Sequence, residues 1–274
     1  MHWKEHNEGE LRAVLSTLES LFADIDVDFY LIGAIARDYW YSKGKISSRA
    51  TRDIDFAILM SDAEKYQAVR SNLIGKGYNE TGENAYVLIS PSGIQVDLLP
   101  FGEIANEGRV VVEGEGMTNI QVDGFQEVYA AGTADADLTT GHVFKAATLS
   151  SIVLLKLIAY DDRPERRIKD AGDIAGIIRH FFELHSELIY DQHIDLFNSN
   201  EIPELEEIAA LVIGREMKKI CIQNDSLKQR LNRILDQEIN KDSSSRFLIR
   251  MVEETRTDIE VMKKLLENMV KGLR

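Results

Sequence analysis

Cysteine is almost absent from this sequence, with Cys221 alone among 274 residues. A single thiol excludes an intrachain disulfide framework and is typical of proteins of the reducing cytosol. Long apolar runs are also missing, because residues 152–159, the most apolar stretch, are interrupted by Lys156 and are far too few to span a bilayer. Residues 1–5 have no apolar signal-peptide core. We therefore expect a cytoplasmic protein with no membrane partner.

Positive charge is scarce as well. The chain carries 32 Lys and Arg residues against 46 Asp and Glu residues, a formal net charge of −14. A protein that captures nucleic acid by bulk electrostatics normally has a basic footprint, so the balance argues against that class. A local basic groove remains compatible with an acidic average, and residues Arg163, Arg166, Arg167, Lys169 and Arg179 are candidates for one.

Two carboxylates, Asp53 and Asp55, stand two residues apart in an otherwise apolar segment. If residues 53–60 form a strand, the period of two places both carboxylates on one face. Two neighbouring anions repel by roughly 1 to 4 kcal/mol, depending on the local dielectric constant. A hard divalent cation with oxygen ligands is the expected counter-ion. The alternative is that Asp53 ends a loop and pairs with Arg49 or Arg52.

A third carboxylate, Asp97, lies in the second strand of a predicted hairpin. If that strand neighbours residues 53–60, three carboxylates converge on one metal site, as metal-assisted nucleotidyl transfer requires. Asp97 is then also a candidate general base. The alternative places Asp97 at a sheet edge, with no role in chemistry.

Gly33 follows a predicted strand and precedes a predicted helix. A glycine there lets the backbone approach a phosphate group and offers amide N–H groups at a helix start. Arg37, one turn into that helix, either contacts phosphates or forms a structural salt bridge. A glycine turn before the paired carboxylates predicts nucleotide chemistry.

Lys156 is a lone cation in a very apolar predicted helix. Its ammonium group must reach solvent, pair with a buried acid or meet a ligand phosphate. Asp170 and Asp173 share a face of the next predicted helix. One interpretation pairs Lys156 with Asp170. The other places Lys156 or Lys169 on a triphosphate, with an aspartate orienting the base, the ribose or the lysine.

The two halves of the chain differ in pattern, which predicts an α/β (α+β) fold. A small mixed-sheet domain over residues 1–145 is followed by an all-helical domain over residues 146–274. Expected strands cover residues 28–32, 53–60, 86–89, 94–99, 109–113 and 125–129. Expected helices cover residues 8–23, 34–41, 62–73, 148–160, 166–183, 203–221, 224–240 and 245–271.

Taken together, these motifs resemble the nucleotidyltransferase superfamily of the DNA polymerase β type and, within it, the AbiEii-type toxin family of type IV toxin–antitoxin systems. The resemblance covers about residues 25–180. The matching runs are Gly33–Arg37, Arg49–Phe56, Val96–Leu98, Leu155–Ala159, Asp162–Arg163 and Lys169–Ile174. One departure is Ala34, where many members have glycine or serine. Alanine keeps a backbone amide, so we expect a modest loosening of the phosphate grip.

The resemblance implies a role for each candidate residue. Metal binding falls to Asp53, Asp55 and Asp97, which together with Lys156 form the catalytic set. The candidate nucleotide-binding residues are Gly33, Ala34, Arg37, Arg52, Lys169 and Asp170.

The function implied by the resemblance is transfer of a nucleoside monophosphate from a nucleoside triphosphate to an acceptor. The cofactor is Mg²⁺ or Mn²⁺, and the helical domain closes the nucleotide cleft. The implied acceptor is RNA such as tRNA, and the implied protein partner is a cognate antitoxin. Two alternatives stay open. One is a small, antibiotic-like acceptor, and the other is a degenerate member that binds nucleotide or a partner without catalysis.

Overall fold

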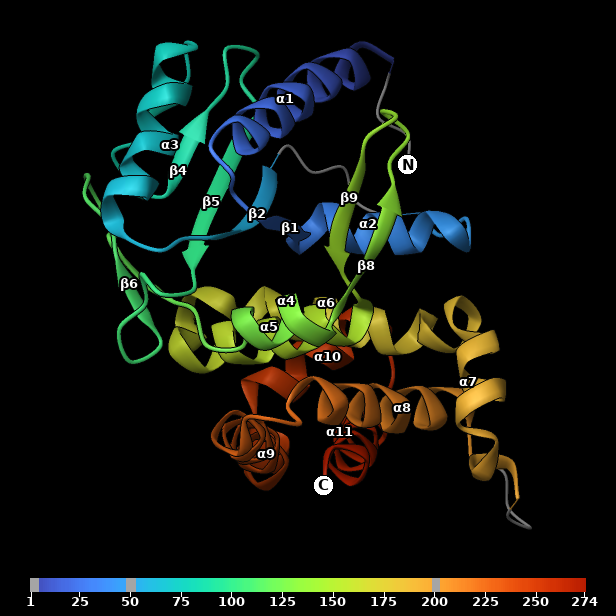
Figure 1. Ribbon diagram of the computed structural model, residues 1–274. Coiled ribbons are helices and arrows are strands. Elements are labelled where there is room, and N and C mark those ends of the chain that lie inside the picture. Colours follow the sequence, from blue (N-terminus) through green and yellow to red (C-terminus); the bar gives the residue numbers. More distant parts are fainter. Residues whose placement is uncertain (1–4, 48–52, 199–202) are drawn as a thin grey trace. The chain divides into compact units, whose positions relative to one another are not determined.

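The computed structural model describes residues 5–47, 53–198 and 203–274. The chain divides into two compact units (Figure 1). The first contains residues 1–129 and 133–148, and the second contains residues 130–132 and 149–274. Every strand in the described ranges lies in the first unit, and the second unit is helical. The predicted fold class is thus confirmed, whereas a catalytic role for one unit and a cleft-closing role for the other stay predictions.

A mixed sheet of seven strands forms the centre of the first unit, in the order β3-β4-β5-β2-β1-β9-β8. Strand β2 runs parallel to β5 and antiparallel to β1, so it lies in the interior of the sheet. The strands are β1 Phe29–Ile32, β2 Asp53–Leu59, β3 Asn79–Glu80, β4 Val87–Ile89, β5 Gln95–Phe101, β8 Thr133–Asp137 and β9 Val143–Ala147. A separate ribbon pairs β6 (Arg109–Val111) with β7 (Asn119–Gln121).

One face of this sheet is apolar and is covered by α1 (Glu5–Asp24) and α3 (Ala63–Gly75) (Figure 1). The ring of Phe56 on β2 lies 5.9 Å from that of Phe22 on α1. Alternation along β2 therefore turns Asp53 and Asp55 to the opposite face.

The opposite face carries the carboxylates at one end and aromatic rings at the other. Tyr30 on β1 lies 5.7 Å from Phe101 on β5, measured between ring centroids. The Tyr30 hydroxyl donates a hydrogen bond of 2.9 Å to the carbonyl of Phe125, the first residue of α4 (Phe125–Ala131). Helix α2 (Gly33–Lys43) follows β1 directly, and its Trp40 donates to the Ala147 carbonyl on β9 at 2.8 Å.

Helix α4 corrects the expectation of a strand at residues 125–129. Phe125 and Val128 are both buried, and the Val128 N–H bonds to the Gly124 carbonyl at 2.9 Å. Apolar residues three apart suit a helix face, and so short a segment does not distinguish the two periods from sequence alone. Strands β8 and β9 were not expected from the sequence. Alanine and aspartate, which make up most of β8, are weak strand formers and hide that signal.

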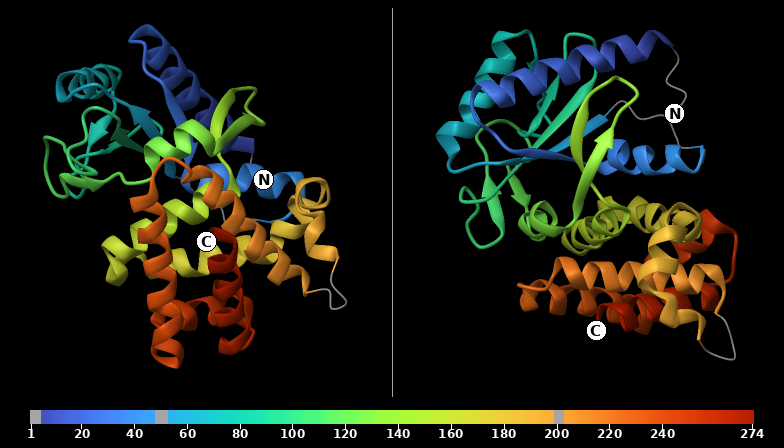
Figure 2. Two further views of the ribbon diagram at one scale, coloured as in Figure 1. Left: turned by 60° about the horizontal axis from the view of Figure 1, so that its bottom comes forward. Right: turned by 45° about the vertical axis from the view of Figure 1, so that its right-hand side comes forward.

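The second unit is an assembly of helices, shown from two further sides in Figure 2. Helices α8 and α11 cross with their backbones in contact, because a Cβ atom on Gly272 would lie 2.1 Å from the Leu211 carbonyl oxygen. The helices are α5 Leu149–Asp162, α6 Pro164–Leu184, α7 Ser186–Gln192, α8 Leu205–Ile220, α9 Asp225–Lys241, α10 Arg246–Thr255 and α11 Ile259–Leu273.

The single helix expected over residues 245–271 is instead two helices, α10 and α11. The break lies at Arg256, whose φ of +58° and ψ of 40° are left-handed and end α10. Thr257 and Asp258 follow, and residues of these types favour helix caps and turns over helix interiors. Helix α7 was not expected from the sequence.

Candidate active site

The register between β2 and β5 sets the geometry of the candidate site. Asp55 lies opposite Asp97, and Asp53 lies opposite Gln95. Residues that face each other on adjacent strands point to the same side of a sheet, and such strands are about 4.8 Å apart. Asp53 is exposed, whereas the other three side chains are partly buried. The structure thus brings Asp55 and Asp97 side by side, on the face that also carries Asp53.

Gly33 lies against Asp55, since β1 pairs with β2 and Ile32 faces Asp55 across that pair. Its φ of +64° is in the left-handed region that favours glycine. A Cβ atom on Gly33 would also lie only 2.2 Å from Oδ2 of Asp55. Only glycine, which has no Cβ atom, therefore leaves room for the Asp55 carboxylate in its observed position. Ala34, the next residue, is half-buried in the first turn of α2.

The donors of this face fit a hard divalent cation. Carboxylate oxygens are the ligands that Mg²⁺ prefers, and Gly33 keeps a cradle beside Asp55 that any side chain would fill. Across the described ranges, the side chains as they stand form no group of three or more His, Cys, Asp or Glu residues that could hold a metal ion. Joint metal binding by Asp53, Asp55 and Asp97 therefore stays a prediction.

Gln95 is a member of this face that the sequence analysis missed. Its Nε2 donates a hydrogen bond to Oδ1 of Asp97 at 2.8 Å. Its position two residues before Asp97 on the same strand was the available signal, because residues i and i+2 of a strand share a face.

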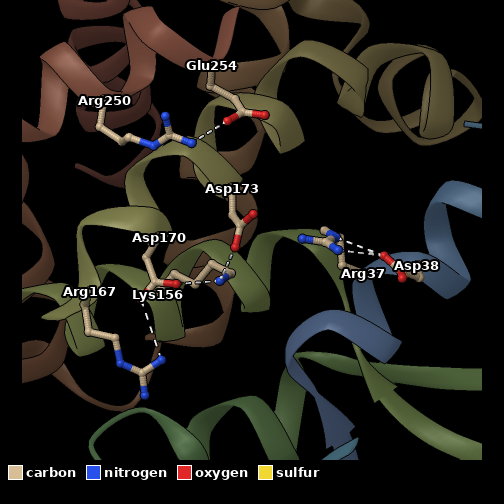
Figure 3. A network of polar contacts seen from close by, with 8 residues as sticks. All are labelled: Arg37, Asp38, Lys156, Arg167, Asp170, Asp173, Arg250 and Glu254. Carbon is tan, nitrogen blue, oxygen red and sulfur yellow. Dashed lines mark hydrogen bonds and ion pairs between the residues drawn. The ribbon is translucent and has the colours of Figure 1, made fainter. Parts of the chain in front are cut away.

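Arg37 forms the salt bridge that was one of its two predicted roles (Figure 3). Its Nε and Nη2 donate to Oδ1 of Asp38 at 3.0 and 2.8 Å, and both residues are buried. The guanidinium carbon also lies 5.7 Å from the centre of the Tyr41 ring. Contact between Arg37 and a nucleotide stays a prediction.

In the second unit, Lys156 of α5 lies between Asp170 and Asp173 of α6 (Figure 3). Its Nζ is 2.6 Å from Oδ1 of Asp170 and 2.8 Å from Oδ2 of Asp173. Burial by itself lowers the pKa of Lys156, but the two carboxylates outweigh that effect and raise the pKa above its ordinary value. The predicted pair with Asp170 is present, with Asp173 as a further partner.

The second oxygen of Asp170 has a different environment. Oδ2 is buried and accepts no hydrogen bond from the described part of the chain, with Nη1 of Arg167 at 4.0 Å. Lys169, the neighbouring candidate, is exposed. Arg52 lies outside the described residues, as do Arg49 and Thr51 of the same motif.

The family model described as "Nucleotidyl transferase AbiEii toxin, Type IV TA system" matches residues 18–257. The chain therefore belongs to this family of nucleotidyltransferase toxins, which confirms the resemblance. The family implies a nucleoside triphosphate as substrate. No curated protein sequence matches this one. In the described part of the chain, no helix has both the length and the apolarity that a membrane span requires.

Three solved structures are similar to the chain at low identity. One is the lincosamide antibiotic adenylyltransferase LnuA with lincomycin bound, at 17% identity and a TM-score of 0.33, covering 51% of this chain and 82% of that one. Another is the antibiotic-resistance factor ANT(2'')-Ia, with 12% identity and a TM-score of 0.38, and the match covers 84% of this chain and 97% of that one. The third is an antigenic nucleotidyltransferase-like protein from Paracoccidioides brasiliensis, with 16% identity and a TM-score of 0.41, and the match covers 81% of this chain and 92% of that one.

Proposed function

We propose that this chain moves a nucleoside monophosphate from a nucleoside triphosphate to an RNA acceptor such as tRNA, in the cytosol, with Mg²⁺ held by Asp53, Asp55 and Asp97. The observation that carries the proposal is the in-register pairing of Asp55 with Asp97 inside the sheet of a nucleotidyltransferase-family chain. Two carboxylates at this spacing repel each other, and a divalent cation removes the repulsion.

The proposed reaction is a displacement at the α-phosphorus. The acceptor hydroxyl oxygen forms a bond to that phosphorus, and the bond from phosphorus to the oxygen that bridges to the β-phosphate breaks. Pyrophosphate leaves with the bonding electrons, and the hydroxyl proton passes to a carboxylate of the face, which we assign to Asp97. Bound Mg²⁺ would supply charge neutralisation on the triphosphate oxygens.

Phosphate binding is proposed for the start of α2. The helix begins at Gly33, and the first N–H groups of a helix have no partner within it. The amides of Gly33 and Ala34 therefore suit an anionic ligand, which also gains from the helix dipole. The remaining proposed nucleotide contacts are Arg37, Arg52, Lys156, Lys169 and Asp170.

The RNA acceptor is supported by exposed cations on an otherwise acidic chain. Arg166, Arg167, Lys169 and Arg179 are all exposed on α6. Contacts between lysine or arginine and phosphate contribute most of the non-specific affinity for nucleic acids and are weakened by salt. A cognate antitoxin is the proposed protein partner, because the family model is that of a toxin of a toxin–antitoxin system.

The test is incubation of the purified protein with Mg²⁺, each α-³²P-labelled nucleoside triphosphate and total cellular RNA, with Asp55→Asn as control. Label on RNA with the wild-type protein, and none with the variant, is the expected result. Label on a small molecule only would replace the RNA acceptor with the small-acceptor alternative. If neither RNA nor a small molecule is labelled, and nucleotide affinity is the same with and without Mg²⁺, the enzymatic proposal is contradicted.

A further inference from the structure

Gln95 is a neutral polar side chain on the carboxylate face, and it lies opposite Asp53 in the pairing of β2 with β5. The register makes an array of four side chains, with Asp53 and Asp55 on β2 and Gln95 and Asp97 on β5. Gln95 Nε2 donates to Oδ1 of Asp97 at 2.8 Å. We propose that Gln95 is a positioning residue that holds the Asp97 carboxylate in its orientation for metal binding. This inference rests on the proposed function.

Strand β4, the other neighbour of β5, faces Asp97 and Gln95 with apolar side chains. Strand β4 places Val87 opposite Asp97 and Ile89 opposite Gln95. Both are apolar, and Val87 is buried. A carboxylate next to such side chains is costly to orient without a hydrogen bond, because the apolar wall replaces water on that side. The Gln95 amide supplies one such hydrogen bond, at a spacing of two residues.

The chemical identity of Gln95 also suits the role. An amide donates N–H groups, so it binds the ionised form of Asp97, which is the form that ligates a cation. A glutamate at position 95 would add a fourth negative charge to the face. In its ionised form it would also have no N–H or O–H group to donate to Asp97. Hydrogen-bond partners of metal ligands fix ligand orientation, and their loss typically weakens metal binding about 10- to 100-fold.

The chain offers a matched control in its separate β-ribbon. Gln121 on β7 donates from Nε2 to Oδ2 of Asp123 at 2.9 Å, with the same spacing of two residues. Gln95→Met and Gln121→Met therefore each remove an amide-to-carboxylate hydrogen bond and put an apolar side chain of similar length in its place. Gln121→Met also removes the hydrogen bond of 3.0 Å that Oε1 of Gln121 accepts from Nε of Arg109. For Mn²⁺ binding the relevant difference is that Asp97 belongs to the carboxylate face, whereas Asp123 follows β7 of the separate ribbon.

The experiment is titration of the full chain with Mn²⁺ alone, followed by electron paramagnetic resonance. For Gln95→Met we expect Kd for Mn²⁺ to rise about 10- to 100-fold, and for Gln121→Met we expect no change. In the labelled transfer assay, saturating Mn²⁺ should restore much of the rate of Gln95→Met, because the ligand itself is intact. If Gln95→Met lowers Tm more than Gln121→Met does, the titration is repeated with Gln95→Asn, which shortens the side chain by one methylene group. We expect Kd for Mn²⁺ to rise in this variant as well.

Two results would overturn the inference. Wild-type Kd for Mn²⁺ in the folded Gln95 variants, with a weakened Kd in Asp97→Asn, would reject the positioning role and leave the proposed function intact. Unchanged Kd in both Asp55→Asn and Asp97→Asn would reject the metal site itself and the inference with it.

Discussion

Gly33 and Asp55 occupy adjoining space at the start of α2, such that a Cβ atom on Gly33 would overlap Oδ2 of Asp55 at 2.2 Å. The glycine therefore serves the carboxylate face directly, in addition to any contact with phosphate. A turn glycine and a strand aspartate, separated by 21 intervening residues in the sequence, form one structural unit.

Gly33→Ala tests this relationship. The left-handed φ of +64° costs about 1–2 kcal/mol for a residue with a Cβ atom, and the new atom also displaces the Asp55 carboxylate. Gly93→Ala is the matched control, because Gly93 has a φ of +81° with nothing within 4 Å of an added Cβ atom. We expect both variants to lose stability by a similar backbone term, measured by urea denaturation. Only Gly33→Ala should lose transfer activity, and equal activity in the two variants would contradict the assignment.

Asp55→Asn separates catalysis from folding. The substitution removes one of two facing charges, so we expect the free energy of unfolding to stay the same or to rise. Transfer should fall by more than about 100-fold, because loss of a direct ligand exceeds the usual effect of losing its hydrogen-bond partner. Thermal unfolding and labelled transfer, measured on one preparation, check both halves. A folded variant with full activity would remove Asp55 from the catalytic set.

Lys156→Met distinguishes the ion-pair role of Lys156 from its proposed triphosphate contact. Removing the cation leaves Asp170 and Asp173 without their shared partner, which should cost about 3 kcal/mol of stability. The double variant Lys156→Met/Asp173→Asn removes one of the two stranded charges and should recover part of that loss. Urea denaturation measures the stability term.

The same two variants test the triphosphate contact through steady-state kinetics. If Lys156 contacts triphosphate, KM for the nucleotide stays raised in the double variant even where stability recovers. A KM that returns to the wild-type value as stability recovers would leave Lys156 with a structural role only.

His185 predicts a pH dependence of stability. Burial lowers the pKa of His185 from its ordinary value of 6.5 to about 4. Between these values the unfolded chain binds a proton that the folded chain does not, so stability is lost as pH falls from 6.5 toward 4. The loss is at most about 3 kcal/mol. Urea denaturation over this pH range should show a smaller loss of stability in His185→Phe than in the wild type. Equal losses would show that the pKa of His185 is the same in the folded and the unfolded chain, which contradicts the prediction.

The part of the site that lies on one strand was predictable from the sequence. Asp53 and Asp55 stand in an apolar segment whose alternation predicts β2, and Gly33 marks the turn before α2. The alignment of Asp55 with Asp97 was not predictable, because the parallel pairing of β2 with β5 joins segments far apart in the chain and local patterns do not set its register. Gln95 is a different case, because its hydrogen bond to Asp97 lies within β5 and the spacing of two residues was visible in the sequence.

Lys156 shows a different limit. The apolar helix around it predicts that the cation needs a partner, and the sequence offered Asp170 as one. That Asp173 also reaches Lys156 depends on how α5 packs against α6, which helical periodicity alone does not define.

The most direct test is anomalous diffraction from crystals of the protein grown with Mn²⁺ and a non-hydrolysable nucleoside triphosphate. The expected result is an anomalous peak between β2 and β5, coordinated by Asp55 and Asp97, with the triphosphate next to Gly33. A nucleotide bound elsewhere, or a Mn²⁺ peak that touches neither carboxylate, would contradict the proposed site.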